Sequence, residues 1–122
     1  GAGLNVTKTT GITGDEGSSN APLCTSNTRA FQAAVTIDSA IADNAHSIGF
    51  VVNNNEVSSS SVIMATVTSA VNSGASNILA QGGIEAYAHT LTNGTSFQFS
   101  LVNRIGAEIA ADSVITINFI VI

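Results

Sequence analysis

Several residues could in principle bind a metal or move a proton, but none falls into a spacing that such chemistry requires. His46 and His89 lie in separate predicted strands, with no His-x-His pattern and no cluster of carboxylates near either. We therefore expect both histidines to be structural residues, at the surface or half-buried. The pair Asp15-Glu16 follows Gly14, but the alternating acids of a calcium loop are missing. The sequence predicts no metal site.

Nucleophiles and cofactor loops are equally poorly supported. No Gly-x-Ser-x-Gly elbow occurs among the many serines, and Gly82-Gly83 reads as a turn because no lysine or helix start follows it. Cys24 has no neighbouring base, so an inert thiol is expected, and a single cysteine excludes an internal disulfide. We expect no catalytic residue and no cofactor, and thus a protein that is not an enzyme.

Composition narrows the possible partners of this chain. Its 122 residues are enough for one domain, only 9% of them are charged, and the net charge is −5. Lys8, Arg29 and Arg104 are its only lysine or arginine residues, which excludes a surface that tracks nucleic-acid phosphates. The apolar runs are too short to span a bilayer, so no membrane partner is expected. An intracellular assembly compartment is favoured.

The first part of the chain, residues 1–28, is interpreted as an extended N-terminal arm that precedes a domain at residues 29–122. Leu4, Val6 and Ile12 are the sizeable apolar side chains of its glycine-rich beginning. Alone, they could not bury enough surface to offset the entropy of ordering. We expect the arm to lie on its own domain, on a sister subunit or on a larger surface. Leu4–Val6 could add a short strand to a sheet edge.

The remaining chain alternates apolar and polar residues in short runs that turn signals separate. These runs predict strands at Phe31–Ile37, His46–Asn53, Val62–Ala70, Asn77–Leu79, Ile84–Leu91, Ser96–Asn103 and Val114–Ile122. Asn93-Gly94 between two of them is a strong hairpin signal, because both residues accept a positive φ.

The last predicted strand is the one around which the domain is organised. Its inward side should carry the core, and the same strand is a candidate for contacts between subunits; these residues are Ile115, Ile117, Phe119 and Val121. Its other side is also largely apolar, which predicts cover on both sides, within the chain or from a neighbouring subunit.

About seven or eight short strands and no convincing helix predict an all-β fold, an antiparallel β-sandwich of jelly-roll-like or immunoglobulin-like type. The tryptophan and cysteine pair of a true immunoglobulin domain are absent.

From Ser47 onward the chain resembles a small β-sandwich domain of tailed-bacteriophage virions, found in capsid decoration proteins and fibre tips. The matching pieces are a Phe-x-Val-x-Asn strand, a Val-rich strand, a Phe-x-x-x-Leu-x-Asn strand and a closing Val-Ile-x-Ile-Asn-Phe-x-Val-Ile strand, at Phe50–Asn54, Val62–Met64, Phe97–Asn103 and Val114–Ile122. The Gly82–Leu91 segment departs from the pattern. The resemblance implies a place on the virion surface and probable homotrimers, and it supplies no catalytic residues.

Three functions stay open. The favoured one is a capsid decoration or cement protein, assembled in the host cytoplasm, that stabilises a phage head through oligomer and arm contacts with the lattice of the major capsid protein. The second is a receptor-binding tip of a tail or head fibre, which would normally show several exposed aromatic side chains. The third is a strand-exchange fibre or pilus subunit with Leu4–Ile12 as the donor strand.

Overall fold

The computed structural model describes residues 4–7, 22–37, 40–47, 49–71 and 83–122. This part of the chain forms eight strands and no helix. They are β1 (Leu4–Thr7), β2 (Pro22–Thr25), β3 (Ala30–Thr36), β4 (Phe50–Asn53), β5 (Ile63–Val71), β6 (Ile84–Thr92), β7 (Ser96–Asn103) and β8 (Val114–Val121). The all-β expectation is confirmed.

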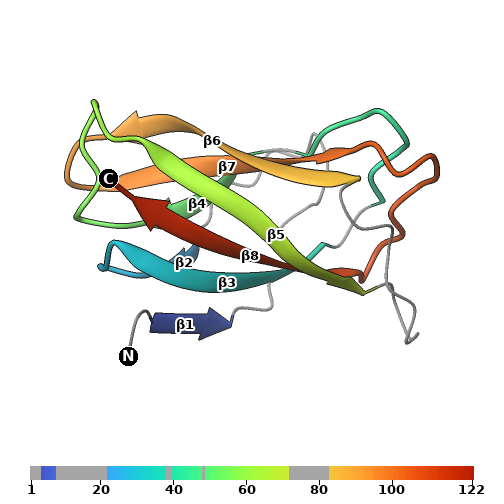
Figure 1. Ribbon diagram of the computed structural model, residues 1–122, viewed down its shortest axis with the longest axis horizontal. Coiled ribbons are helices and arrows are strands. Elements are labelled where there is room, and N and C mark those ends of the chain that lie inside the picture. Colours follow the sequence, from blue (N-terminus) through green and yellow to red (C-terminus); the bar gives the residue numbers. More distant parts are fainter. Residues whose placement is uncertain (1–3, 8–21, 38–39, 48, 72–82) are drawn as a thin grey trace.

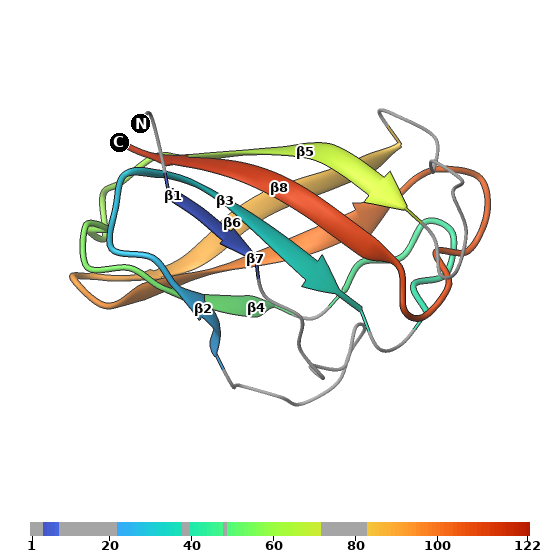
Figure 2. The same ribbon diagram turned by 90° about the horizontal axis from the view of Figure 1, so that it is seen from below.

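The strands form two sheets, which we call sheet A and sheet B. Sheet A has the order β1-β3-β8-β5 and sheet B the order β2-β4-β7-β6. In each sheet three strands are antiparallel, and a short strand from the first 28 residues is added in parallel at one edge. Figures 1 and 2 show the two sheets as two layers, with β5 and β6 along the same side of the molecule.

Aromatic side chains join the two layers. In sheet A, Phe31 stacks on Phe119 with ring centroids 5.1 Å apart. Phe119 in turn meets Phe97 at 5.5 Å and Phe99 at 5.1 Å, both from sheet B. All four rings are buried, because each lies at an inward position of an alternating strand. The pattern of alternate apolar residues therefore builds one core between the sheets.

One antiparallel ladder runs through both sheets and ties the first half of the domain to the second. It begins between β3 and β8, where Phe31 pairs with Phe119, and ends between β4 and β7, where Phe50 pairs with Phe99. Two isolated bridges, Ile41 with Ile109 and His46 with Val102, continue it across the change of sheet. The chain is thus a long hairpin folded over itself, with β5 and β6 added along it.

Two buried asparagines hold the loops at the ends of the sheets. The side-chain amide of Asn54 donates to the carbonyl oxygens of Ser26 and Thr28 at 2.6 and 2.8 Å, and its oxygen accepts from the Glu56 N–H at 2.8 Å. At the other end, Asn103 makes the same kind of contacts. Its amide donates to Ile41 and Ala107 carbonyls, and its oxygen accepts from the Ile105 N–H. Both side chains are fully satisfied, as burial requires.

The strand β8 is buried on one face only. Ile115, Ile117, Phe119 and Val121 lie in the core between the sheets. Cover of its other side from within the chain is not found among the described residues, where Val114, Ile120 and the following Ile122 are exposed; cover from a neighbouring subunit stays a prediction. A two-layer arrangement covers one face of each sheet, so no layer formed by the described residues lies above the outer face of sheet A.

Smaller differences concern turns and strand lengths. The predicted strand at His46–Asn53 is shorter, since β4 covers only Phe50–Asn53. The β6–β7 hairpin closes with a three-residue turn, in which the Thr95 N–H donates to the Thr92 carbonyl at 3.0 Å. Of Asn93-Gly94, only Gly94 takes a positive φ (66°). The Thr92–Thr95 hydrogen bond makes Gly94 the third residue of the turn, and a positive φ at that residue alone is typical of a type II turn, which needs one such residue rather than two. The predicted strand at Asn77–Leu79 lies outside the described residues.

Candidate interaction surface

Large apolar side chains gather at one corner of the outer face of sheet A. Met64 on β5 pairs with Ile120 on β8. Just beyond them Val62 and Ile122 exchange two backbone hydrogen bonds, at 3.1 and 2.8 Å. These four residues, called the apolar corner below, are 54, 46, 60 and 63% exposed, in that order. Monomeric proteins leave single apolar residues at the surface, but a contiguous group of this kind is typical of an interaction site.

The strands around this corner carry no charge. None of β1, β3, β5 and β8 contains an Asp, Glu, Lys, Arg or His residue. Threonines and amides occupy the outward positions between the apolar ones. Gln32 donates from its side-chain amide to Asn118 Oδ1 at 2.9 Å, so these two polar groups partly satisfy each other. The outer face of sheet A is therefore neutral, with hydroxyl and amide groups beside the apolar corner.

The charged residues that the structure describes lie off this face. Arg29, which precedes β3, pairs with Glu56 in the β4–β5 loop at 3.2 Å. Arg104 pairs with Glu85 at 3.7 Å, beside sheet B. Both pairs are exposed, so they contribute little to stability. These charged groups thus lie outside the strands of sheet A, whose outer face is neutral although the chain as a whole is acidic.

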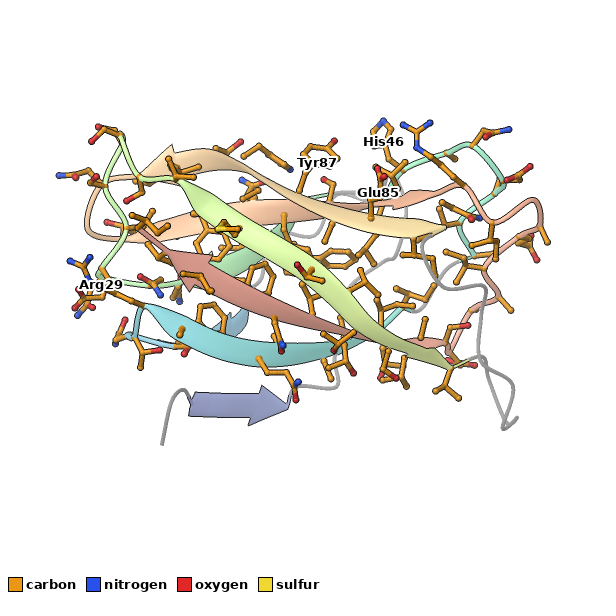
Figure 3. The ribbon with its side chains drawn as sticks, viewed as in Figure 1. Arg29, His46, Glu85 and Tyr87 are labelled. Carbon is orange, nitrogen blue, oxygen red and sulfur yellow. The ribbon has the colours of Figure 1, made fainter. Side chains whose placement is uncertain are left out.

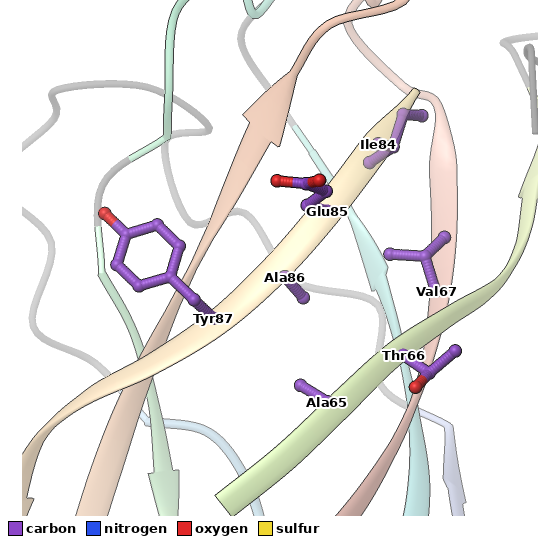
Figure 4. Close-up of a pocket in the computed structure, with 7 residues that line it drawn as sticks. All are labelled: Ala65, Thr66, Val67, Ile84, Glu85, Ala86 and Tyr87. Atoms are coloured by element: carbon purple, nitrogen blue, oxygen red, sulfur yellow. The ribbon is translucent and has the colours of Figure 1, made fainter. Parts of the chain in front are cut away.

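A shallow groove of about 410 Å³ lies between the edge strands β5 and β6. The side chains at its floor are small, because Ala65 and Ala86 occupy inward positions there. Figure 4 shows Ala86 projecting from β6 toward β5, while Glu85 and Tyr87 project to the opposite side of β6. The groove is open and offers no converging set of polar groups.

The outer face of sheet B is polar and carries both histidines. Figure 3 shows His46, Glu85 and Tyr87 on the same side of the molecule. His46 is exposed, and His89 is partly buried with its ring 5.4 Å from the ring of Tyr87. Burial lowers the pKa of His89, and the positive charge that His46 can carry acts in the same direction. These observations fit the expected structural role.

The structure brings His89 and Ser100 together, a contact that the sequence pattern did not predict. His89 Nε2 lies 2.8 Å from Ser100 Oγ, and its Nδ1 lies 2.9 Å from Thr90 Oγ1. A hydroxyl beside an imidazole is the start of a nucleophile–base pair, but no carboxylate orients this ring and Ser100 is only 3% exposed. The contacts form a network that holds β6 to β7. The predicted hairpin could have indicated this contact, because its register pairs His89 with Gln98, two residues before Ser100.

The residues predicted for the assembly arm fall partly within the description. Leu4 and Val6 belong to β1, which pairs in parallel with β3 of the same chain. Cys24 belongs to β2, which pairs with β4. Two pieces of the arm thus lie on the chain's own sheets, which is one of the open alternatives. Ile12, Asp15-Glu16 and the Gly82 half of Gly82-Gly83 lie outside the described residues.

Within the described ranges, no group of three or more metal-ligating side chains occurs. Nor does that part of the chain contain a helix long and apolar enough to cross a membrane.

Comparisons with known proteins found no matching family model, no similar curated protein and no similar solved structure.

Proposed function

We propose that this chain is a structural virion protein, a capsid decoration protein that stabilises a phage head through contacts between its copies and with the lattice of the major capsid protein. The single observation that carries the proposal is the neutral outer face of sheet A with its apolar corner. A protein with an uncharged and partly apolar sheet face is suited to bind other protein surfaces rather than small molecules.

The fold in this proposal is a β-sandwich of jelly-roll type. In an immunoglobulin-like sheet, strands that follow one another in the chain pair directly, as A with B and D with E. No such neighbours pair in sheet A, whose order is β1-β3-β8-β5. The ladder that joins the two halves of the domain across both sheets instead supports a jelly roll, a double-sheet fold known from capsid and lectin domains. Because fold does not imply function, the surface must carry the functional argument.

The resemblance to phage β-sandwich domains supports the virion assignment and the expectation of a homotrimer. Its matching segments are β4, the start of β5, most of β7 and β8, which contribute to the core and the neutral face. The segment Gly82–Leu91, which departs from the resemblance, contributes to the edge strand β6.

The arm is assigned to attachment in this proposal. A peptide that adds a strand to a sheet edge gains backbone hydrogen bonds without needing a deep pocket. β1 makes such an addition on β3 with only four residues, Leu4–Thr7. We propose that residues 1–20 exchange these contacts for contacts with the capsid lattice when the protein binds a head.

The test is co-sedimentation of the intact protein and of a variant lacking residues 1–20 with undecorated phage heads. We expect the intact protein to pellet with the heads and the shortened protein to bind at least tenfold more weakly. The melting temperature of the shortened protein should stay within a few degrees of the parent, because only a four-residue edge strand of the described fold is lost. Equal binding by the two forms would contradict the role of the arm, and no binding by either would contradict the decoration role.

A receptor-binding fibre tip is the second candidate, favoured by one observation. Tyr87 is 44% exposed on the side of β6 that faces away from β5, next to the groove, and its ring could stack on a sugar. In that case heads should not bind the protein, and Tyr87→Ala should abolish its adsorption to host cells. For a strand-exchange subunit, removal of residues 1–20 should instead stop polymerisation.

A further inference from the structure

We infer that the apolar corner and the neutral face around it form the contact between copies of this chain. The inference deepens the proposed function, on which it rests, by naming the surface and the partner: a second copy of the same chain, facing the first with its own sheet A. It is drawn from the placement of apolar and charged side chains on the described strands.

Exposed apolar side chains are concentrated on one side of the described structure. Of the six large hydrophobic side chains that are exposed among the described residues, five lie on the outer side of sheet A or directly beside it: Val62, Met64, Val114, Ile120 and Ile122. The sixth, Tyr87, belongs to sheet B and has a polar hydroxyl. Such a one-sided distribution indicates a face that becomes covered, because random exposure would scatter these residues over both sheets.

The strands of sheet A differ from the rest of the acidic chain in carrying no charge. The chain carries −5, so two copies repel one another wherever their carboxylates approach. The described carboxylates lie in loops or, for Glu85, on β6, and sheet A has none in any of its four strands. Judged from the described residues, its outer face is thus a surface where like-charged copies can meet without repulsion. A strongly basic partner would gain nothing there, since the face offers no acidic group to pair.

The arrangement of the corner on a sheet is suited to packing against a second sheet. The apolar corner lies on two hydrogen-bonded neighbours, β5 and β8, so Met64 and Ile120 stand side by side on one sheet. Two sheets pack face to face at about 10 Å when their side chains interdigitate. The same four side chains are covered whether two copies meet across a two-fold axis or three copies meet around a three-fold axis.

The experiment compares oligomeric state between matched variants. Met64→Lys, Ile120→Lys and the double variant place a charge in the corner, while Tyr87→Lys places one at an exposed large side chain of sheet B. Mass is measured by sedimentation equilibrium from submicromolar to tens of micromolar chain. We expect a defined oligomer for the parent and for Tyr87→Lys, with at least a tenfold weaker association for each corner variant and a monomer for the double variant.

Folding is checked in parallel by near-ultraviolet circular dichroism and thermal melting. If a lysine variant does not fold, Met64→Gln and Ile120→Thr replace it, because Gln matches Met in length and Thr keeps the β-branch that suits a strand. A monomeric parent at tens of micromolar would overturn the inference. So would a double variant that keeps the parent's mass.

Co-sedimentation with heads separates this inference from the proposed function. A monomeric parent whose head binding is lost in the corner variants would show that the face contacts the capsid; the inference would fall and the proposed function would stand. A parent that oligomerises through the corner but does not bind heads would support the inference and contradict the proposed function.

Discussion

At the scale of single residues, two buried asparagines hold loops in place, a role that the alternation of apolar and polar residues does not predict. Asn54 and Asn103 are both fully buried, and each bonds to two carbonyl oxygens and one N–H of neighbouring loops. An amide is suited to this task, since it carries two donors and an acceptor on one short side chain. Their loss would leave buried backbone groups without partners.

We therefore predict that Asn54→Ala lowers the free energy of unfolding by about 1–3 kcal/mol. That is a substantial part of a total that is about 5–15 kcal/mol for a domain. The neighbouring Asn53→Ala is the matched control, because among the described residues the Asn53 side chain donates only to the exposed Thr25 hydroxyl, at 3.3 Å. It should change stability by less than about 0.5 kcal/mol. Urea unfolding measures both, and equal losses would contradict the assignment.

At the scale of elements, the β6–β7 hairpin fixes which residues of sheet B face one another. Its turn needs a left-handed residue at Gly94 alone, with a φ of 66°. A Cβ added at Gly94 would meet no other atom within 4 Å, so the cost of a side chain there is backbone strain and not a clash.

We expect Gly94→Ala to destabilise the domain by about 1–2 kcal/mol, the cost of a side chain in the left-handed region. Asn93→Ala should be nearly neutral, because Asn93 does not have a positive φ. Urea unfolding again gives the values. A two-residue turn with both positions left-handed would make the two substitutions similarly costly, so the ratio of the two losses distinguishes the turns.

At the scale of the whole molecule, stability and association should be linked. Copies that bind one another only when folded stabilise the fold by mass action, so the melting temperature depends on chain concentration. For a domain of this size, a tenfold increase in concentration should raise it by about 2–4 °C.

Calorimetry over a hundredfold range of concentration tests this link. The parent and Tyr87→Lys should show the rise, and the double corner variant Met64→Lys with Ile120→Lys should melt at one temperature throughout. A parent with a concentration-independent melting temperature would contradict obligate association of the copies.

The sequence by itself determined that the chain is all-β and which side of each main strand is apolar enough for the core. Ile115, Ile117 and Phe119 could be placed on one side of a strand because side-chain alternation is a local property of extended backbone. The same local reasoning located Gly94 in a turn.

Apart from the β6–β7 hairpin, which the Asn93-Gly94 turn predicted, only the tertiary structure decided which strands are neighbours, and with them the candidate surface. Val62 and Ile122 are far apart in the chain, yet they exchange two backbone hydrogen bonds at the apolar corner. The contact between His89 and Ser100 and the anchoring role of Asn103 also depend on pairing. Strand pairing is set by competition among many long-range contacts of similar energy, and alternation within one strand carries no information about its partner.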